Sequence, residues 1–261
     1  MIYLNNSVIQ QNHFPDGTLL MKGFVSNGPN VIKWNYENDA ELFTLICLVG
    51  HLRSHGCEEY QLVMPYIPHA RQDRVKNEED VFTLKYFCEV INSLNFKLIT
   101  VLDAHSNVAL ALLDRVKEVK PWDHIENAIQ SIPVDRELIA FYPDEGAMKR
   151  YSAGINLPFA FGIKKRDWET GKIEGLDLAG QVDKINGADV IIIDDICSRG
   201  GTFYHSALAL KEAGAANIYL YITHCEDTIH EGELLKDNGL IEKIYRTCSL
   251  PVRAHDKIEL V

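Results

Sequence analysis

Two adjacent carboxylates beside a donor-rich turn are the most distinctive chemical feature of this sequence. The run VIIIDDICSRGGT, residues 190–202, places four apolar residues before Asp194 and Asp195 and then a turn that ends in Gly-Gly-Thr. Carboxylates accept hydrogen bonds from hydroxyls, whereas backbone N–H groups and hydroxyl side chains donate to phosphate oxygens. The pattern therefore indicates a site for a phosphorylated sugar, although Asp-Asp and Gly-Gly also occur in ordinary turns and caps.

A strand and a helix must position this turn. The β-branched residues 190–193 are typical of a strand covered on both faces, as in a parallel sheet. The segment FYHSALALKEAGA, residues 203–215, has helical spacing of apolar residues, and its Gly214 is an end signal. The turn therefore lies beyond the carboxyl end of a strand, where open α/β sheets bind ligands. It also precedes a helix N-terminus, where free N–H groups and the helix dipole favour an anion.

The composition of the chain is that of an ordinary globular protein. Of its 261 residues, 46% are hydrophobic and 24% are charged, and the formal net charge is −11. This length is enough for one large domain or two small ones, and the negative charge argues against a nucleic-acid partner. Because the sequence shows neither a signal peptide nor an apolar segment of spanning length, we expect a cytoplasmic protein with no membrane partner. We expect the six cysteines to be free thiols, with Cys197 a small filler residue.

The strand–helix pattern runs twice along the chain, which predicts an α/β fold with two similar halves. Each half is expected to be an open, mainly parallel sheet flanked by helices. We expect the halves to be residues 1–135 and 136–261. The period of the apolar residues predicts strands at residues 59–67, 96–105, 137–146, 159–166, 188–195 and 217–225, with helices at 40–56 and 82–94.

A second polar cluster follows the strand expected at residues 59–67. In MPYIPHARQDR, residues 64–74, the side chains of Arg71, Gln72 and Asp73 are expected to project from an exposed loop. Arginine suits a polyphosphate because its planar fork of donors binds two oxygens at once. Taken alone, such a run is more often a solvated charged turn.

In combination, these motifs resemble those of the ribose-phosphate diphosphokinases (phosphoribosylpyrophosphate synthetases), which have the type I phosphoribosyltransferase fold. Residues 190–202 are similar to the loop that binds phosphoribosyl diphosphate in both groups. Residues 64–74 are similar to the Pro-Tyr-x-Pro-Tyr-Ala-Arg-Gln-Asp run of the synthetases, with His69 in place of the second tyrosine. Because phosphoribosyltransferases bind no ATP, this second run favours the ATP-using branch.

The resemblance implies a role for each matching residue. Asp194 and Asp195 would hold the ribose hydroxyls, and the 5-phosphate would lie against Ser198, Arg199, Gly200, Gly201 and Thr202. The ATP-binding residues would be Arg71, Gln72, Asp73, His105 of VLDAHS, and Asp16 of the FPDGT hairpin, which in the family reaches a neighbouring subunit. Magnesium would be held by His105 and by Asp144 of YPDEGAMKR, and the catalytic residues would be Lys164 and Arg166 of FGIKKRDWETG, with His105.

The implied reaction transfers the β,γ-diphosphate of ATP, with Mg²⁺, to the 1-hydroxyl of a ribose 5-phosphate unit and releases AMP. The family also implies a homo-oligomer, a dimer or a hexamer. Three alternatives remain open: a phosphoribosyltransferase that consumes the activated sugar, a non-catalytic regulatory homologue, and an enzyme that converts ADP-ribose to ADP-ribose pyrophosphate for NAD salvage. Arg71 and Gln72 argue against the first, and the matching residues Lys164 and Arg166 argue against the second.

Two segments depart from the family pattern. Thr18 stands where the hairpin usually has glutamate, and Ser198-Arg199-Gly200-Gly201-Thr202 replaces the usual Asp-Thr-x-Gly-Thr. Arg199 adds a charge and a fork of donors, which is more than one monophosphate held by backbone groups requires. This residue keeps ADP-ribose open as a substrate beside ribose 5-phosphate, with a solvent-facing arginine as the plainer interpretation.

Overall fold

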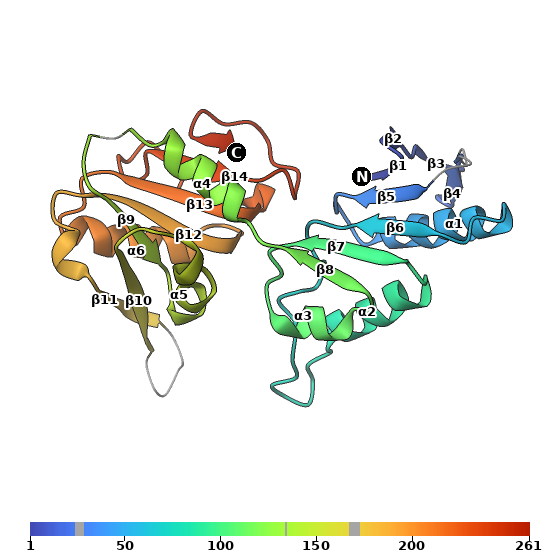
Figure 1. The fold of residues 1–261 in the computed structure, drawn as a ribbon, viewed down its shortest axis with the longest axis horizontal. Helices are drawn as coiled ribbons and strands as arrows, with labels where there is room; N and C mark the ends of the chain where they lie inside the picture. Colours follow the sequence, from blue (N-terminus) through green and yellow to red (C-terminus); the bar gives the residue numbers. More distant parts are fainter. Residues whose placement is uncertain (24–28, 134, 167–172) are drawn as a thin grey trace. The chain divides into compact units, whose positions relative to one another are not determined.

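Two sheets organise the chain, and each belongs to its own unit, Met1–Lys120 (unit 1) or Pro121–Val261 (unit 2) (Figure 1). The computed structural model describes residues 1–23, 29–133, 135–166 and 173–261, with the backbone alone described for residues 164–166 and 173–175. Among the described residues, no helix has the length and apolar character needed to cross a membrane.

The sheet of unit 1 has six strands in the order β2-β1-β5-β6-β7-β8. Strands β5 to β8 pair in parallel, and β1 pairs antiparallel with both β5 and β2. The strands are β1 (Ile2–Leu4), β2 (Ser7–Val8), β5 (Asn30–Trp34), β6 (Tyr60–Val63), β7 (Leu98–Leu102) and β8 (Val116–Val119). The helices are α1 (Ala40–Ser54), α2 (Thr83–Ser93) and α3 (Asn107–Leu112).

Helix α1 shows why this segment folds onto the sheet. Its Leu45, Leu48, Val49 and Leu52 are fully buried and recur every three or four residues, so they form one apolar face. They join a single core with sheet residues such as Ile32. Removing this apolar surface from water is what stabilises the helix in the unit.

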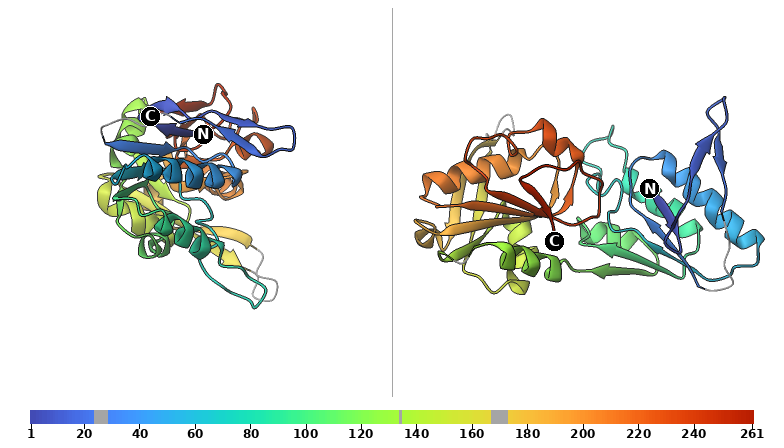
Figure 2. Two further views of the ribbon diagram at one scale, coloured as in Figure 1. Left: turned by 90° about the vertical axis from the view of Figure 1, so that its right-hand side faces the viewer. Right: turned by 90° about the horizontal axis from the view of Figure 1, so that it is seen from above.

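A two-stranded hairpin, β3 (Gln11–His13) and β4 (Leu19–Met21), projects from the rest of unit 1 (Figure 2). Its tip is the FPDGT turn. Gly17 adopts a left-handed φ of 84°, and Oδ1 of Asp16 accepts hydrogen bonds from the backbone N–H and the hydroxyl of Thr18 at 3.0 and 2.7 Å. These hydrogen bonds lower the pKa of the exposed Asp16 carboxyl. Asp16 therefore organises the tip of the hairpin.

The sheet of unit 2 has seven strands in the order β11-β10-β9-β12-β13-β14-β15. All neighbours pair in parallel except β10 and β11, which are antiparallel. The strands are β9 (Leu138–Tyr142), β10 (Phe159–Arg166), β11 (Ile173–Gly180), β12 (Asp189–Cys197), β13 (Ile218–Cys225), β14 (Lys243–Arg246) and β15 (Ile258–Leu260). The helices are α4 (Trp122–Ser131), α5 (Glu145–Tyr151) and α6 (Gly201–Glu212), with short 3₁₀ turns η1 (Ser152–Gly154), η2 (Val182–Lys184) and η3 (Asp227–Glu231).

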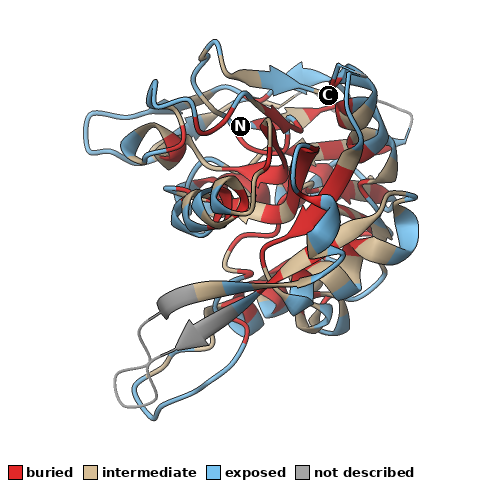
Figure 3. Ribbon diagram, turned by 90° about the vertical axis from the view of Figure 1, so that its left-hand side faces the viewer, coloured by how far each residue is buried: buried red, intermediate tan, exposed pale blue. Residues whose placement is uncertain are grey.

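Strand β12 is covered on both faces, as its run of β-branched residues predicts. Ile191 and Ile193 belong to the core that includes residues of α4 and α5, whereas Val190 and Ile192 belong to the core that includes residues of α6. All four side chains are fully buried, and buried residues, red in Figure 3, run through the strands. The predicted fold class is confirmed: both sheets are mainly parallel and flanked by helices.

The two compact units divide after Lys120, earlier than the boundary expected after residue 135. The difference is helix α4, which the expected boundary places in the first half. Its Ile125 and Ala128 are buried in the core of unit 2 together with residues of β9 and β12. The sequence of an amphipathic helix indicates that one face will be buried, but it does not say against which sheet.

Candidate active site

The carboxyl end of β12 carries the two aspartates that the sequence singles out. Strand β12 continues through Cys197, so Asp194 and Asp195 lie inside the paired strand. Asp194 is partly exposed, and its Oδ1 accepts a hydrogen bond from the backbone N–H of Asp195 at 2.9 Å. Asp195 is only 5% exposed. The strand therefore carries two ordered carboxylates near its carboxyl end, the end at which parallel sheets bind ligands.

Helix α5 brings two further charged residues to unit 2's sheet. Asp144 caps the helix, with Oδ1 accepting from the backbone N–H of Ala147 at 3.1 Å. In the last turn, Nη1 of Arg150 donates to Oδ2 of Asp195 at 2.7 Å. Arg150 was given no role on the basis of the sequence. The sequence does contain an indication of it, because Arg150 is the last residue of the YPDEGAMKR motif.

The carboxylates of Asp144, Asp194 and Asp195 make the carboxyl end of the sheet electronegative. Burial raises the pKa of Asp194 well above its usual range, and the negative charges of Asp195 and Asp144 raise it further. A divalent cation would relieve this repulsion, and Mg²⁺ prefers oxygen ligands. Among the described residues, no group of three or more metal-ligating side chains is found. The residues present fit a magnesium ion held by one or two protein ligands, with substrate phosphates and water completing its shell.

A tight turn links β12 to α6. Gly200 adopts a left-handed φ of 78° as the residue before the helix, and a β-carbon there would collide with the side chain of Leu234. Glycine is therefore required for both conformation and space. The exposed Gly201 and Thr202 begin α6, so its free N–H groups lie at the position where the sequence predicts the 5-phosphate.

Turn η3 contacts the loop at residues 198–202 through side chains and backbone. The hydroxyl of Ser198 lies 3.0 Å from that of Thr228, and Nη2 of Arg199 lies 2.9 Å from Oε2 of Glu231. The backbone is close-packed as well, because a β-carbon at Gly232 would collide with the carbonyl oxygen of Arg199. No sequence motif marks η3, so its residues were not among those expected at the site.

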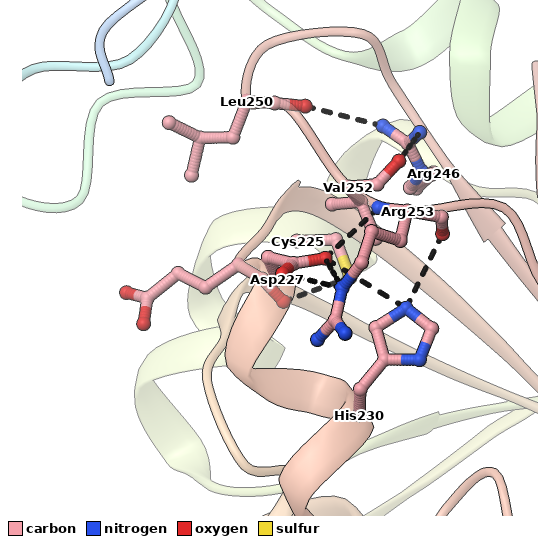
Figure 4. A network of polar contacts seen from close by, with 8 residues as sticks. Cys225, Asp227, His230, Arg246, Leu250, Val252 and Arg253 are labelled. Carbon is pink, nitrogen blue, oxygen red and sulfur yellow. Dashed lines mark hydrogen bonds and ion pairs between the residues drawn. The ribbon is translucent and has the colours of Figure 1, made fainter.

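The segment after β14 holds η3 in turn (Figure 4). Nε of Arg253 donates to Oδ2 of Asp227 at 2.8 Å, and the ring of His230 contacts the carbonyl oxygen of Arg253 at 3.2 Å. Arg246 is largely buried and donates to the carbonyl oxygens of Leu250 and other residues of this segment. A chain of polar contacts thus runs from the segment after β14 to the loop at residues 198–202.

Cys197 is a structural residue. It is 1% exposed and pairs in register with Cys225 on β13. A hydrogen bond with the Cys225 thiol and burial both raise the pKa of Cys197, which disfavours the thiolate needed for nucleophilic attack. This agrees with its interpretation as a filler residue.

In unit 1, the structure places Arg71 and Gln72 on the surface after β6, as expected. Asp73 differs from expectation, because it is 5% exposed and does not project into solvent. Nε of Arg74 donates to Asp73 at 2.8 Å, and this contact lowers the pKa of the carboxyl. The adjacent cation explains why the charge tolerates burial. The partly buried His105 follows β7 and lies close enough to Asp73 to lower the pKa of that carboxyl.

The structure places the four predicted catalytic and metal-binding residues only in part. Lys164 and Arg166 belong to the backbone of β10, but their side chains lie outside the described residues. His105 follows β7 of unit 1, and Asp144 follows β9 of unit 2. Each ends a parallel strand of its own sheet, so their meeting at one magnesium–ATP site stays a prediction.

Comparisons with known proteins agree with this architecture. The crystal structure of phosphoribosylpyrophosphate synthetase from Mycobacterium smegmatis matches 97% of this chain and 85% of its own, with a TM-score of 0.79 and 18% identity. The ribose-phosphate pyrophosphokinase of Pyrococcus abyssi is 26% identical over 261 aligned residues, 97% of this chain and 87% of that protein. The chain is similar to ribose-phosphate pyrophosphokinases over nearly its whole length.

Other pyrophosphokinases match over shorter stretches. That of Thermococcus kodakarensis is 26% identical over 249 residues, which cover 93% of this chain and 86% of that protein. That of Saccharolobus solfataricus is 28% identical over 197 residues, 72% of this chain and 66% of that protein. No protein-family model matches the chain. The resemblance inferred from the motifs is confirmed, as is the fold, and the roles of individual residues stay predictions.

Proposed function

We propose that this chain is an ATP-dependent diphosphokinase that transfers the β,γ-diphosphate of ATP to the 1-hydroxyl of a ribose 5-phosphate unit and releases AMP. One observation carries the proposal: Asp194 and Asp195 lie near the carboxyl end of a central parallel strand, and a short turn leads from this strand to the glycine-capped N-terminus of α6. This arrangement suits a ligand with vicinal hydroxyls at one end and a phosphate at the other. The similarity to named pyrophosphokinases over nearly the whole chain supports the ATP-using reaction.

In this mechanism Asp194 and Asp195 accept hydrogen bonds from the ribose hydroxyls and thereby orient the 1-hydroxyl. Ser198 to Thr202 enclose the 5-phosphate with hydroxyl and backbone donors. Arg71 and Gln72 bind ATP together with His105, while the buried Asp73 holds Arg74 beside them, and Asp16 of a neighbouring copy contributes to the adenine site of a homo-oligomer. Lys164 and Arg166 place positive charge on the transferring group, where negative charge develops in the transition state.

Magnesium fits the donor set. Asp144, with His105, would hold the ion, which neutralises phosphate charge when bound. Asp144 also caps α5, so its carboxylate has a fixed direction before any ligand binds. Preorganised charge of this kind lowers the cost of reorganisation during the reaction. We expect the enzyme to act in the cytoplasm, where ATP and sugar phosphates are present.

ADP-ribose is a second candidate for the sugar substrate. The observation in its favour is the side chain of Arg199, which is 72% exposed within the loop expected to bind the 5-phosphate. A guanidinium there can engage a second phosphate. Its product would be ADP-ribose pyrophosphate, an intermediate suited to NAD salvage.

Product analysis tests the proposal directly. The chain is incubated with ATP, Mg²⁺ and either ribose 5-phosphate or ADP-ribose, and AMP release and product mass are recorded. We expect stoichiometric AMP and a sugar product heavier by one diphosphate. If ATP stays intact while a nucleobase is consumed with an activated sugar, the chain is a phosphoribosyltransferase. If neither reaction occurs although the ligands bind, it is a regulatory homologue.

A further inference from the structure

The ion pair between Arg150 and Asp195 is the most buried charge pair at the proposed sugar site. Nη1 of Arg150 lies 2.7 Å from Oδ2 of Asp195, and the two side chains are 23% and 8% exposed. A buried carboxylate without a cation is unfavourable, because it has lost water without gaining an equivalent partner. Arg150 therefore supports both the charge and the direction of the Asp195 side chain.

The guanidinium of Arg150 is itself held in place. Helix α5 begins at the Asp144 cap and ends at Tyr151, whose side chain is fully buried. The guanidinium carbon lies 5.8 Å from the centre of the Tyr151 ring, within the range of a cation–π contact. Because the helix, the ring and the carboxylate all constrain Arg150, little conformational freedom remains to be lost when a ligand binds.

The direction of the Asp195 carboxylate matters because the Asp194 carboxylate is its neighbour in the strand. Asp194 and Asp195 are adjacent in one strand, and like charges at that distance repel. Asp194 is turned toward the backbone N–H of Asp195, and Asp195 is turned toward Arg150. The Asp195 carboxylate therefore has a fixed direction, which a hydroxyl of a bound sugar requires of its acceptor.

We infer that Arg150 is a positioning residue of the sugar site, which holds the Asp195 carboxylate in the direction that receives a ribose hydroxyl. The inference rests on the proposed function, because it concerns the same sugar site. Arg150 acts through Asp195, so its loss should weaken sugar binding while leaving ATP binding nearly unchanged. An ion pair that served stability alone would affect folding without this selectivity.

The chain offers a matched control at the other end of the same strand. Arg136 lies 3.9 Å from Asp189, which is 1% exposed and begins β12 at its amino end. This pair is also an arginine with a buried aspartate, but it lies at the amino end of β12, whereas the proposed site lies at the carboxyl end. Arg136→Met should lower stability without changing the affinity for a sugar phosphate.

Calorimetric binding of ribose 5-phosphate and ADP-ribose, without ATP, to the full chain tests the inference. Arg150→Met should weaken binding of whichever sugar phosphate the native chain takes by about 10-fold to 100-fold. Arg150→Lys, which keeps the charge but not the fork, should recover much of this loss. In an Asp195→Asn background, the further change Arg150→Met should alter affinity by less than about twofold, because no carboxylate charge remains to be held. Binding of ATP, measured separately, should change by less than about twofold in every Arg150 variant.

The outcomes separate the inference from the proposed function. A native chain that binds neither sugar phosphate overturns both. A native chain that binds, together with an Arg150→Met variant of equal affinity, overturns the inference alone. Equal weakening by Arg136→Met, or an additive effect in the Asp195→Asn background, also overturns it, because Arg150 would then act through general stability or another residue. If Arg150→Met does not fold, Arg150→Gln takes its place with the same thresholds.

Discussion

Arg199 and Glu231 form an ion pair that joins the loop after β12 to turn η3, with Nε and Nη2 of Arg199 both 2.9 Å from Oε2 of Glu231. The two side chains are 72% and 52% exposed. Exposed ion pairs of this kind contribute about 0–1 kcal/mol to the free energy of folding. A phosphate can therefore replace the Glu231 carboxylate beside Arg199 at a small cost in stability. The pair therefore leaves the arginine available to a larger substrate.

We expect Arg199→Thr to lower kcat/KM for ADP-ribose by about tenfold, the usual effect of losing one charge-assisted contact. The value for ribose 5-phosphate should change by less than about twofold, because backbone donors of α6 remain. Steady-state kinetics with both sugars measure this. Lys97→Thr is the control, since Lys97 forms a similarly exposed pair with Glu59 in unit 1, away from the loop. A native preference for ribose 5-phosphate that Arg199→Thr leaves untouched would show that Arg199 is a solvent-facing variant.

Lys164→Ala and Arg166→Ala should lower kcat by about 10²–10³-fold, because contacts to the transferring group strengthen in the transition state. The KM for the sugar should change little, since the sugar site lies at β12 and α6. Rapid-quench measurement of AMP formation separates chemistry from product release. Lys184→Ala, a lysine of η2 paired with Glu137, serves as a control for the loss of a surface cation. Unchanged kcat in both variants would remove Lys164 and Arg166 from the mechanism.

Asp194→Asn should stabilise the protein at neutral and alkaline pH while it impairs sugar binding. The pKa of Asp194 is raised in the folded state, so its ionisation as pH rises destabilises the fold. The gain in Tm should be about 2–4 °C for each kcal/mol of repulsion removed. It should fade as pH drops below the ordinary aspartate pKa, because the protonated native side chain then resembles asparagine. Thermal melting across pH measures the difference, and a gain that persists unchanged at acid pH would contradict the explanation.

Gly232→Ala should disturb the phosphate loop through packing alone. The added methyl group would collide with the carbonyl oxygen of Arg199, so backbone must move in η3 or in the loop. We expect a loss of about 1–3 kcal/mol of stability and weaker sugar-phosphate binding. Gly50→Ala in α1 is the control, because nothing lies near its β-carbon position and alanine favours a helix. Native stability and affinity in Gly232→Ala would show that this contact relaxes without cost.

Local pattern was enough to predict the fold class. The β-branched run of β12 and the apolar spacing of α1 and α6 follow from sequence periods that each element must satisfy by itself. The same holds for the residues at the strand ends, because a parallel sheet collects them at its carboxyl edge wherever the helices pack. Asp144, Asp194 and Asp195 are therefore recognisable from the sequence alone.

Only the tertiary structure decided which side chains pair with one another. Arg150 and Asp195 are 45 residues apart in the sequence, and Arg199 and Glu231 are 32 apart, so neither pairing follows from local periodicity. The burial of Asp73 depends on Arg74 beside it and on the packing of unit 1, and a charged run in the sequence carries no sign of it. Helix α4 shows the same division: its sequence marks a face for burial, whereas packing with β9 and β12 selects the sheet. Periodicity is a local property of the chain, but the partner of a side chain is set by which distant segments the hydrophobic core brings together.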